Sequence, residues 1–290
     1  METQYQFDLN CTTFTGEQLK RINLIRGVMA MVCVLIVAII LLFLLCYKIY
    51  STTFQRLYIY VIVADLFSEA MQACGIEHQF HYEGQKQVCF YLAFITHWTS
   101  IMVFMFAFET IFYLFYLVIT QIWSRRDICC CCHPPHSKNC QILLFVLMPI
   151  TLSFPIAWVP YQNNSYGLAG PWCWVRSIDE NCMSIGLRDQ MIYFSLYWAV
   201  GAVGIAINII FSVLYHKMTP AFKEAKNLLK LTLILMCFQL VYIIIVTLQL
   251  AVRLYTALTG SQQHIALWYM HALVIPIGQL IFLLGYAFTL

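Results

Sequence analysis

Acidic side chains lie inside long apolar stretches of this chain, where a charge is costly and marks a candidate functional site. Asp65 lies well inside the second stretch, and Glu69 follows one helical turn later, so both project from one helix face. Glu109 follows Cys89 by 20 residues, which is about 30 Å along a helix. We predict that these carboxylates join a polar network that rearranges when helices shift. Its facing members from later stretches are Asn208, Gln239 and Gln279.

The same polar groups are also compatible with two different roles. Hydrogen bonds that only hold helices together account for the three amides, and we favour that interpretation for them. A proton or cation pathway would use the same three carboxylates. The acidic residues therefore do not distinguish a receptor from a transporter.

A second set of polar and aromatic side chains lies near one end of the apolar stretches. Aromatic residues at this depth mostly form an interface belt. His97 and His271 are stronger candidates for a ligand pocket, because histidine facing lipid is unfavourable. The candidate pocket residues are His97, Trp98, Tyr193, Tyr197, Gln249, Trp268 and His271.

Composition indicates which elements position these groups. The 290 residues are 62% hydrophobic and only 10% charged, too few charges to cover a soluble globule of this size. A membrane-spanning helix needs about 20 apolar residues. We predict an all-α integral membrane protein, a seven-transmembrane helix bundle that forms one domain over residues 24–290. The predicted spans are 24–47, 55–75, 89–123, 141–159, 190–215, 226–252 and 264–290.

The positions of the extracellular-type features predict that the amino terminus lies outside. Four spans separate the glycosylation sequons at Asn10 and Asn163, and two separate Cys89 from Cys173. These even intervals allow all four residues to share the oxidising compartment. Residues 1–23 then form a short extracellular tail without the apolar region of a signal peptide, so the first span is expected to be an uncleaved anchor. We expect a multi-pass protein of the plasma membrane.

The distribution of basic residues supports this orientation. Nine of the 16 Lys and Arg residues fall in segments predicted to be cytoplasmic. The predicted outer loops hold Lys86, Arg176, Arg188 and Arg253. Lys20, Arg21 and Arg26 flank the first span on its outer side and oppose the assignment.

Cysteines fall into groups with different predicted chemistry. A Cys89–Cys173 disulfide would pin the second outer loop across the bundle; the alternative is two free thiols. Cys11 and Cys182 form a possible second bridge, which sequence cannot establish. For a cytoplasmic cluster we favour palmitoylation over an unmodified loop or a zinc site, because adjacent cysteines suit tetrahedral geometry poorly. Its members are Cys129, Cys130, Cys131 and Cys132.

Three segments resemble G-protein-coupled receptors. Residues 56–66 (RLYIYVIVADL) resemble the second span of that superfamily. Residues 166–175 (YGLAGPWCWV) resemble the Gly-x-Trp-Cys-Trp pattern of cyclic-AMP-receptor-like receptors, and secretin and adhesion receptors share a related Cys-Trp pair. Residues 108–114 (FETIFYL) are similar to the inner end of the third span in secretin-type receptors. The last span departs from the family pattern, and the third lacks an Asp-Arg-Tyr-type triplet.

The resemblance implies a Cys89–Cys173 bridge and an extracellular ligand, which we expect to be a small molecule or short peptide. It also implies that a heterotrimeric G protein engages the inner ends of the third, fifth and sixth spans. Basic residues there could also contact acidic lipid or form an ordinary positive-inside loop. The candidate inner-face contacts are Arg125, Arg126, Lys217, Lys223, Lys226 and Lys230.

We therefore expect a cell-surface receptor that transmits a signal through helix rearrangement. The alternative is a secondary transporter or channel that uses Asp65, Glu69 and Glu109, although internal repeats are absent. An enzyme is not expected, because His97 and His271 form no His-x-x-x-His pair. We expect no cofactor, no bound metal and no nucleic-acid partner.

Overall fold

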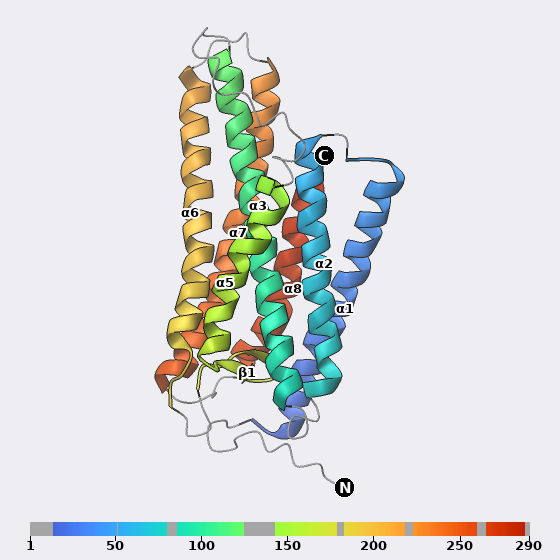
Figure 1. Cartoon of the computed structure of the whole chain (residues 1–290), viewed down its shortest axis with the longest axis vertical. Coiled ribbons are helices and arrows are strands. Elements are labelled where there is room, and N and C mark those ends of the chain that lie inside the picture. Colours follow the sequence, from blue (N-terminus) through green and yellow to red (C-terminus); the bar gives the residue numbers. More distant parts are fainter. Residues whose placement is uncertain are drawn as a thin grey trace.

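Long helices run side by side along the longest axis of the molecule (Figure 1). The computed structural model describes residues 14–50, 52–79, 86–124, 143–178, 183–217, 223–259 and 265–287. The helices are α1 (Gly16–Cys46), α2 (Thr53–Gln79), α3 (Lys86–Ser124), the π-helical turn η2 (Leu143–Leu147), α5 (Met148–Gln162), α6 (Leu187–Lys217), α7 (Lys223–Thr259) and α8 (Ile265–Ala287).

Five of these helices are long and apolar enough to cross a membrane. Two shorter apolar segments, Ile243–Thr259 and Ile265–Gly278, lie within α7 and α8. Large apolar side chains also face outward; in α1, Met31 and Leu35 are 60% and 62% exposed. Such an apolar surface is typical of a protein surrounded by lipid. The predicted mainly helical membrane protein is therefore confirmed, whereas seven spans and the orientation stay predictions. The qualifying segments are Gly16–Cys46, Gln55–Cys74, Lys86–Thr110, Phe145–Gln162 and Leu187–Ile207.

The first helix begins earlier than predicted. Helix α1 begins with a capping box. The Thr15 side chain accepts from the Gln18 backbone N–H, and the Gln18 side chain accepts from the Thr15 backbone N–H. This reciprocal pair satisfies donors that the first helical turn leaves free. Helix α1 thus begins eight residues before the predicted span, and Lys20 and Arg21 belong to it.

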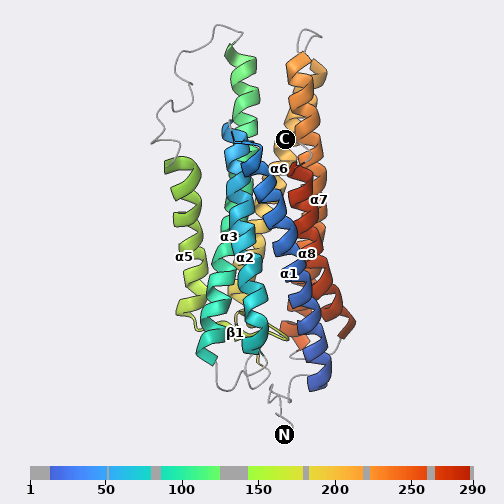
Figure 2. The same cartoon turned by 90° about the vertical axis from the view of Figure 1, so that its right-hand side faces the viewer.

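The helices pack in a closed ring. Consecutive helices contact one another from α1 to α3, from α3 to α5, and onward through α6 and α7 to α8, which returns to α1. Helix α3 also contacts α6 and α7 across the bundle. The view in Figure 2 shows α1 beside α8 and α3 beside α2, in agreement with these contacts.

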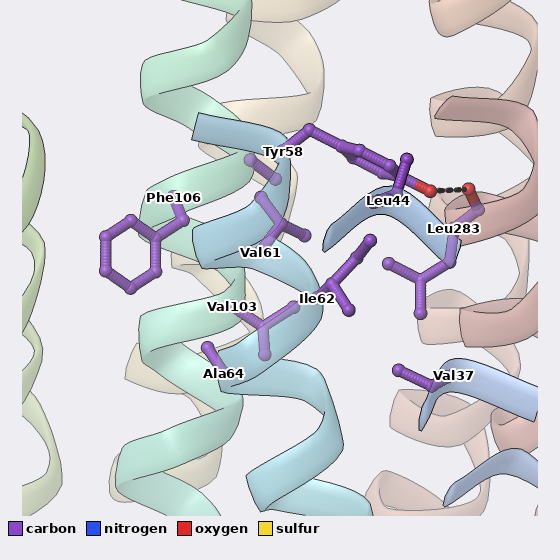
Figure 3. Packing of buried hydrophobic residues seen from close by; sticks show 10 residues of the cluster. Val37, Leu44, Tyr58, Val61, Ile62, Ala64, Val103, Phe106 and Leu283 are labelled. Carbon is purple, nitrogen blue, oxygen red and sulfur yellow. Dashed lines mark hydrogen bonds between the residues drawn. The ribbon is translucent and has the colours of Figure 1, made fainter. Parts of the chain in front are cut away.

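One buried cluster holds α1, α2, α3 and α8 together (Figure 3). Tyr58 of α2 is fully buried, and its hydroxyl donates to the backbone carbonyl of Leu283 in α8 at 2.7 Å. Val61, Ile62 and Val103 pack beside it. Because the polar tip of the tyrosine has a partner, its ring can be buried without leaving an unsatisfied hydroxyl.

A β-hairpin covers one end of the bundle, the end at which α1 begins (Figure 1). Strands β1 (Tyr166–Leu168) and β2 (Cys173–Val175) pair antiparallel, with Leu168 opposite Cys173. We call this the hairpin end. The last residue of α6 and the first of α7 lie at the opposite end of the bundle.

Arg253 lies inside a helix and not in the outer loop where we predicted it. Helix α7 continues to Thr259, and Arg253 is only 2% exposed. Its guanidinium donates to the backbone carbonyl of Ala169 at 3.0 Å and lies near two tryptophan rings. These partners compensate part of the cost of burying the charge. Helix α7 thus extends seven residues beyond the predicted end of this span.

Candidate functional site

The hairpin is tied to α3 by a disulfide. Cys89, near the start of α3, is bonded to Cys173 of β2, with their Cα atoms 5.3 Å apart. The predicted bridge is thus confirmed. It holds the hairpin over the helix ends, so that side chains on both strands enter the bundle.

Trp172, immediately before β2, is the centre of a buried group of cationic and aromatic side chains. Its ring lies 5.3 Å from the ring of Trp268 and 4.8 Å from that of His271, centroid to centroid. The guanidinium carbon of Arg26 lies 3.9 Å from the Trp172 ring, and that of Arg253 lies 4.9 Å from the Trp268 ring. We call these five residues the tryptophan cluster. Contacts of this kind are cation–π interactions.

Gly170, at the hairpin tip, permits this close packing. Its φ of +77° lies in the left-handed region that favours glycine. A Cβ atom at this position would lie 2.5 Å from the Trp268 ring. A side chain here would therefore push the hairpin away from α8.

Arg26 connects the tryptophan cluster to α2. Its Nε donates to Gln72 Oε1 at 3.2 Å, and its Nη2 donates to the same oxygen. The Gln72 amide in turn donates to Glu69 Oε1 at 3.4 Å. Glu69 also interacts electrostatically with Arg26. A series of hydrogen bonds thus runs from the hairpin end to the buried carboxylate of Glu69 in α2.

The second tryptophan of the hairpin, Trp174, packs on another buried group. Its ring lies 5.2 Å from His97 and 5.7 Å from Tyr193. His97 Nδ1 lies 2.6 Å from the Tyr166 hydroxyl, which donates to the Ala157 carbonyl at 2.8 Å. Both bonds form together only if His97 carries its proton on Nδ1, because the tyrosine has one hydroxyl hydrogen. Burial also raises the pKa of Tyr166, so its hydroxyl remains a donor at neutral pH.

Replacing Tyr166 with phenylalanine is expected to destabilise the protein by about 1–3 kcal/mol. The change leaves a buried imidazole nitrogen and a backbone carbonyl without their shared partner. Denaturant unfolding of the purified protein in detergent measures the effect. Tyr91→Phe is the matched control, because Tyr91 is 52% exposed on α3; equal stability of the two variants would contradict the assignment.

The structure gathers most of the predicted pocket residues near the hairpin, in two groups. His97 and Tyr193 lie in contact, with ring centroids 4.5 Å apart, and Trp268 stacks on His271 at 5.8 Å. Trp98 instead packs towards α5, where its indole donates to Ser153 Oγ at 2.9 Å. Gln249 is half-buried in α7, and the side chain of Tyr197 lies outside the described residues.

The predicted switch network is assembled only in part. Asp65 and Glu69 are buried in α2, and nearby Ser68 hydrogen-bonds Ser100 of α3 at 3.1 Å. Glu109 is half-buried about 13 Å further along α3 than Ser100. Among the described residues, no hydrogen bond or ion pair joins Glu109 to Asp65. The side chains of Asn208, Gln239 and Gln279 lie outside the described residues.

Several predictions concern residues or side chains outside the described part of the chain. These are Asn10, Cys11, Arg125, Arg126, Cys129, Cys130, Cys131, Cys132 and Cys182, and the side chains of Lys217, Lys223, Lys226 and Lys230. The other sequon residue, Asn163, follows α5 and is exposed, and its amide donates to both carboxylate oxygens of Asp189. Glycosylation, palmitoylation and inner-face contacts stay predictions.

Sequence reasoning missed several residues of the tryptophan cluster and the residue that connects it to α2. Arg26 and Arg253 were counted as flanking or loop charges, and Gln72 was not singled out. The available signal was Arg26 itself, which stands ten residues inside α1 in an otherwise apolar stretch. Trp172 and Trp174 appeared only as part of a resemblance.

The tryptophan cluster brings guanidinium groups and indole rings together. Guanidinium groups and indole rings bind anionic or flat partners through hydrogen bonds and stacking. No protein-family model matches this chain, and no curated protein matches it.

Proposed function

We propose that this chain is a cell-surface G-protein-coupled receptor that transmits an extracellular ligand signal to heterotrimeric G proteins. The observation that supports the proposal is the disulfide-anchored hairpin, which inserts Trp172 into a buried polar cluster. From there Arg26 and Gln72 lead to Glu69 in α2. A ligand that moves the hairpin would change these contacts and so favour one helix arrangement over another.

In this proposal the two ends of the bundle have different roles. The hairpin end faces outside and receives a small molecule or short peptide, with seven spans crossing the plasma membrane. The opposite end, formed by α3, α6 and α7, meets the G protein. Half-buried Glu109 lies toward that end. In this proposal it belongs to the polar network whose hydrogen bonds rearrange when the helices shift.

Nucleotide exchange on a panel of G proteins tests the proposal. Reconstituted protein is expected to accelerate exchange on at least one G protein. Glu109→Gln is expected to reduce that acceleration about fivefold or more, the range of a typical coupling energy. Glu17→Gln removes an exposed carboxylate from the first turn of α1 and serves as the control.

The outcome also separates the receptor from its alternative. A protein that accelerates exchange on no G protein, yet carries protons or cations across vesicle membranes, would be a transporter or channel. Asp65 is the observation that supports this alternative, because its Oδ2 is buried without a hydrogen-bond partner among the described residues. In that case Asp65→Asn would abolish the flux.

A further inference from the structure

A small polar cavity lies at the hairpin end between α1, α2, α3 and the hairpin. Its volume is about 10 Å³, room for about one water-sized particle. Polar lining groups come from Asn23, Arg26, Gln72 and Thr96, and Trp172 and Cys173 close it from the hairpin. The cavity is therefore built by elements that only the folded bundle brings together.

Arg26, which lines this cavity, has a buried donor without a partner among the described residues. Its Nε and Nη2 both donate to Gln72 Oε1, whereas the buried Nη1 has no hydrogen-bond partner among the described residues. The residue is only 7% exposed. A buried cationic donor without an acceptor is unfavourable, so an acceptor in the cavity would stabilise the fold.

The electrostatic surroundings of Trp172 include a second buried cation. The guanidinium carbon of Arg253 lies 5.7 Å from the Trp172 ring, and its Nη1 donates to a neutral acceptor, the Ala169 carbonyl. Within the described residues, neither arginine forms an ion pair with a carboxylate within 4.0 Å. Glu69 contributes negative charge from α2, at the far side of the Gln72 amide.

We propose that this cavity binds one small monovalent anion, either a halide ion or a single carboxylate group. The anion accepts from Arg26 Nη1 and lies in the field of Arg26 and Arg253. A cavity this small favours a halide ion or a single carboxylate group over the bulkier sulfate dianion. This site concerns ion binding and stands apart from coupling to a G protein.

Thermal unfolding of the purified full-length protein in detergent tests the site. Sodium chloride, bromide, acetate and sulfate are compared with sodium methanesulfonate, whose sulfonate group is bulky like sulfate, at constant ionic strength. An anion that binds only the folded state raises the folded-to-unfolded ratio about tenfold at nine times its Kd. We expect a saturable rise with chloride and bromide, or with acetate if the site takes a carboxylate group, and none with sulfate.

Two variants on one helix provide the matched comparison. Arg26→Gln is expected to abolish the saturable response. Arg21→Gln, which removes an exposed charge from the same helix, is expected to retain it. If Arg26→Gln does not fold, the test rests on the natural protein alone, through the rise in its thermal stability with each of the anions. A response that is absent, that is as large with sulfate, or that persists in Arg26→Gln would overturn the proposal.

Discussion

Replacing Cys173 with serine is expected to lower the free energy of unfolding by about 2–5 kcal/mol. The lost bond joins residues 84 positions apart, and opening so long a loop gives the unfolded chain many more conformations. The hairpin also loses its tether to α3, so the contacts of Trp172 and Trp174 weaken with it. Denaturant unfolding in detergent under oxidising conditions measures the change.

A matched cysteine distinguishes the bridge from the loss of a thiol. Cys74→Ser makes the same chemical change at an exposed free cysteine on α2 and is expected to leave stability nearly unchanged. Reductant should destabilise the natural protein as much as Cys173→Ser does, and should have no further effect on that variant. Equal stability of the two serine variants would show that the bridge does not support the fold.

Truncating Trp172 to alanine is expected to cost about 3–5 kcal/mol, as for other large buried aromatic residues. The ring is 2% exposed and contacts Arg26, Trp268 and His271. Its removal leaves a cavity and takes a cation–π partner from a buried guanidinium. The same unfolding measurement applies, and ligand-dependent signalling should be lost if the proposed receptor function is correct.

Trp198 provides the control for this change. It belongs to α6 and is 48% exposed, so Trp198→Ala removes an equal volume from the outside of the bundle. That variant is expected to lose much less stability. If both tryptophan variants unfolded with equal ease, the tryptophan cluster would not be a structural centre of the hairpin end.

Sequence reasoning succeeded where one segment carried all the information. Length and apolar composition located the helices, because a span satisfies its own backbone hydrogen bonds wherever its neighbours lie. The burial of Asp65 and Glu69 followed in the same way from their positions within an apolar stretch. The Cys89–Cys173 bridge joins two distant segments, and it was predictable because an even number of predicted spans between them places both residues at one end of the bundle.

Sequence reasoning failed where the environment of a residue depends on a distant segment. Arg253 was assigned to a loop, since a charge ordinarily ends an apolar run, yet a carbonyl of the hairpin and two indole rings keep it within α7. Trp98 was grouped with the ligand pocket by depth alone. Trp98 lies on the side of α3 that faces α5, where it contacts Ser153. Which side of a helix faces which neighbour is decided by how the helices pack.

The amino-acid sequence by itself determined that this protein is built of long apolar helices and that acidic groups lie inside them. These properties follow from hydrophobicity and local hydrogen bonding. Only the tertiary structure decided that Arg26 and Arg253 lie near the same indole of Trp172. That arrangement requires the disulfide-held hairpin to fold back over α1 and α7. Contacts between such distant segments produce no periodic pattern in the amino-acid sequence.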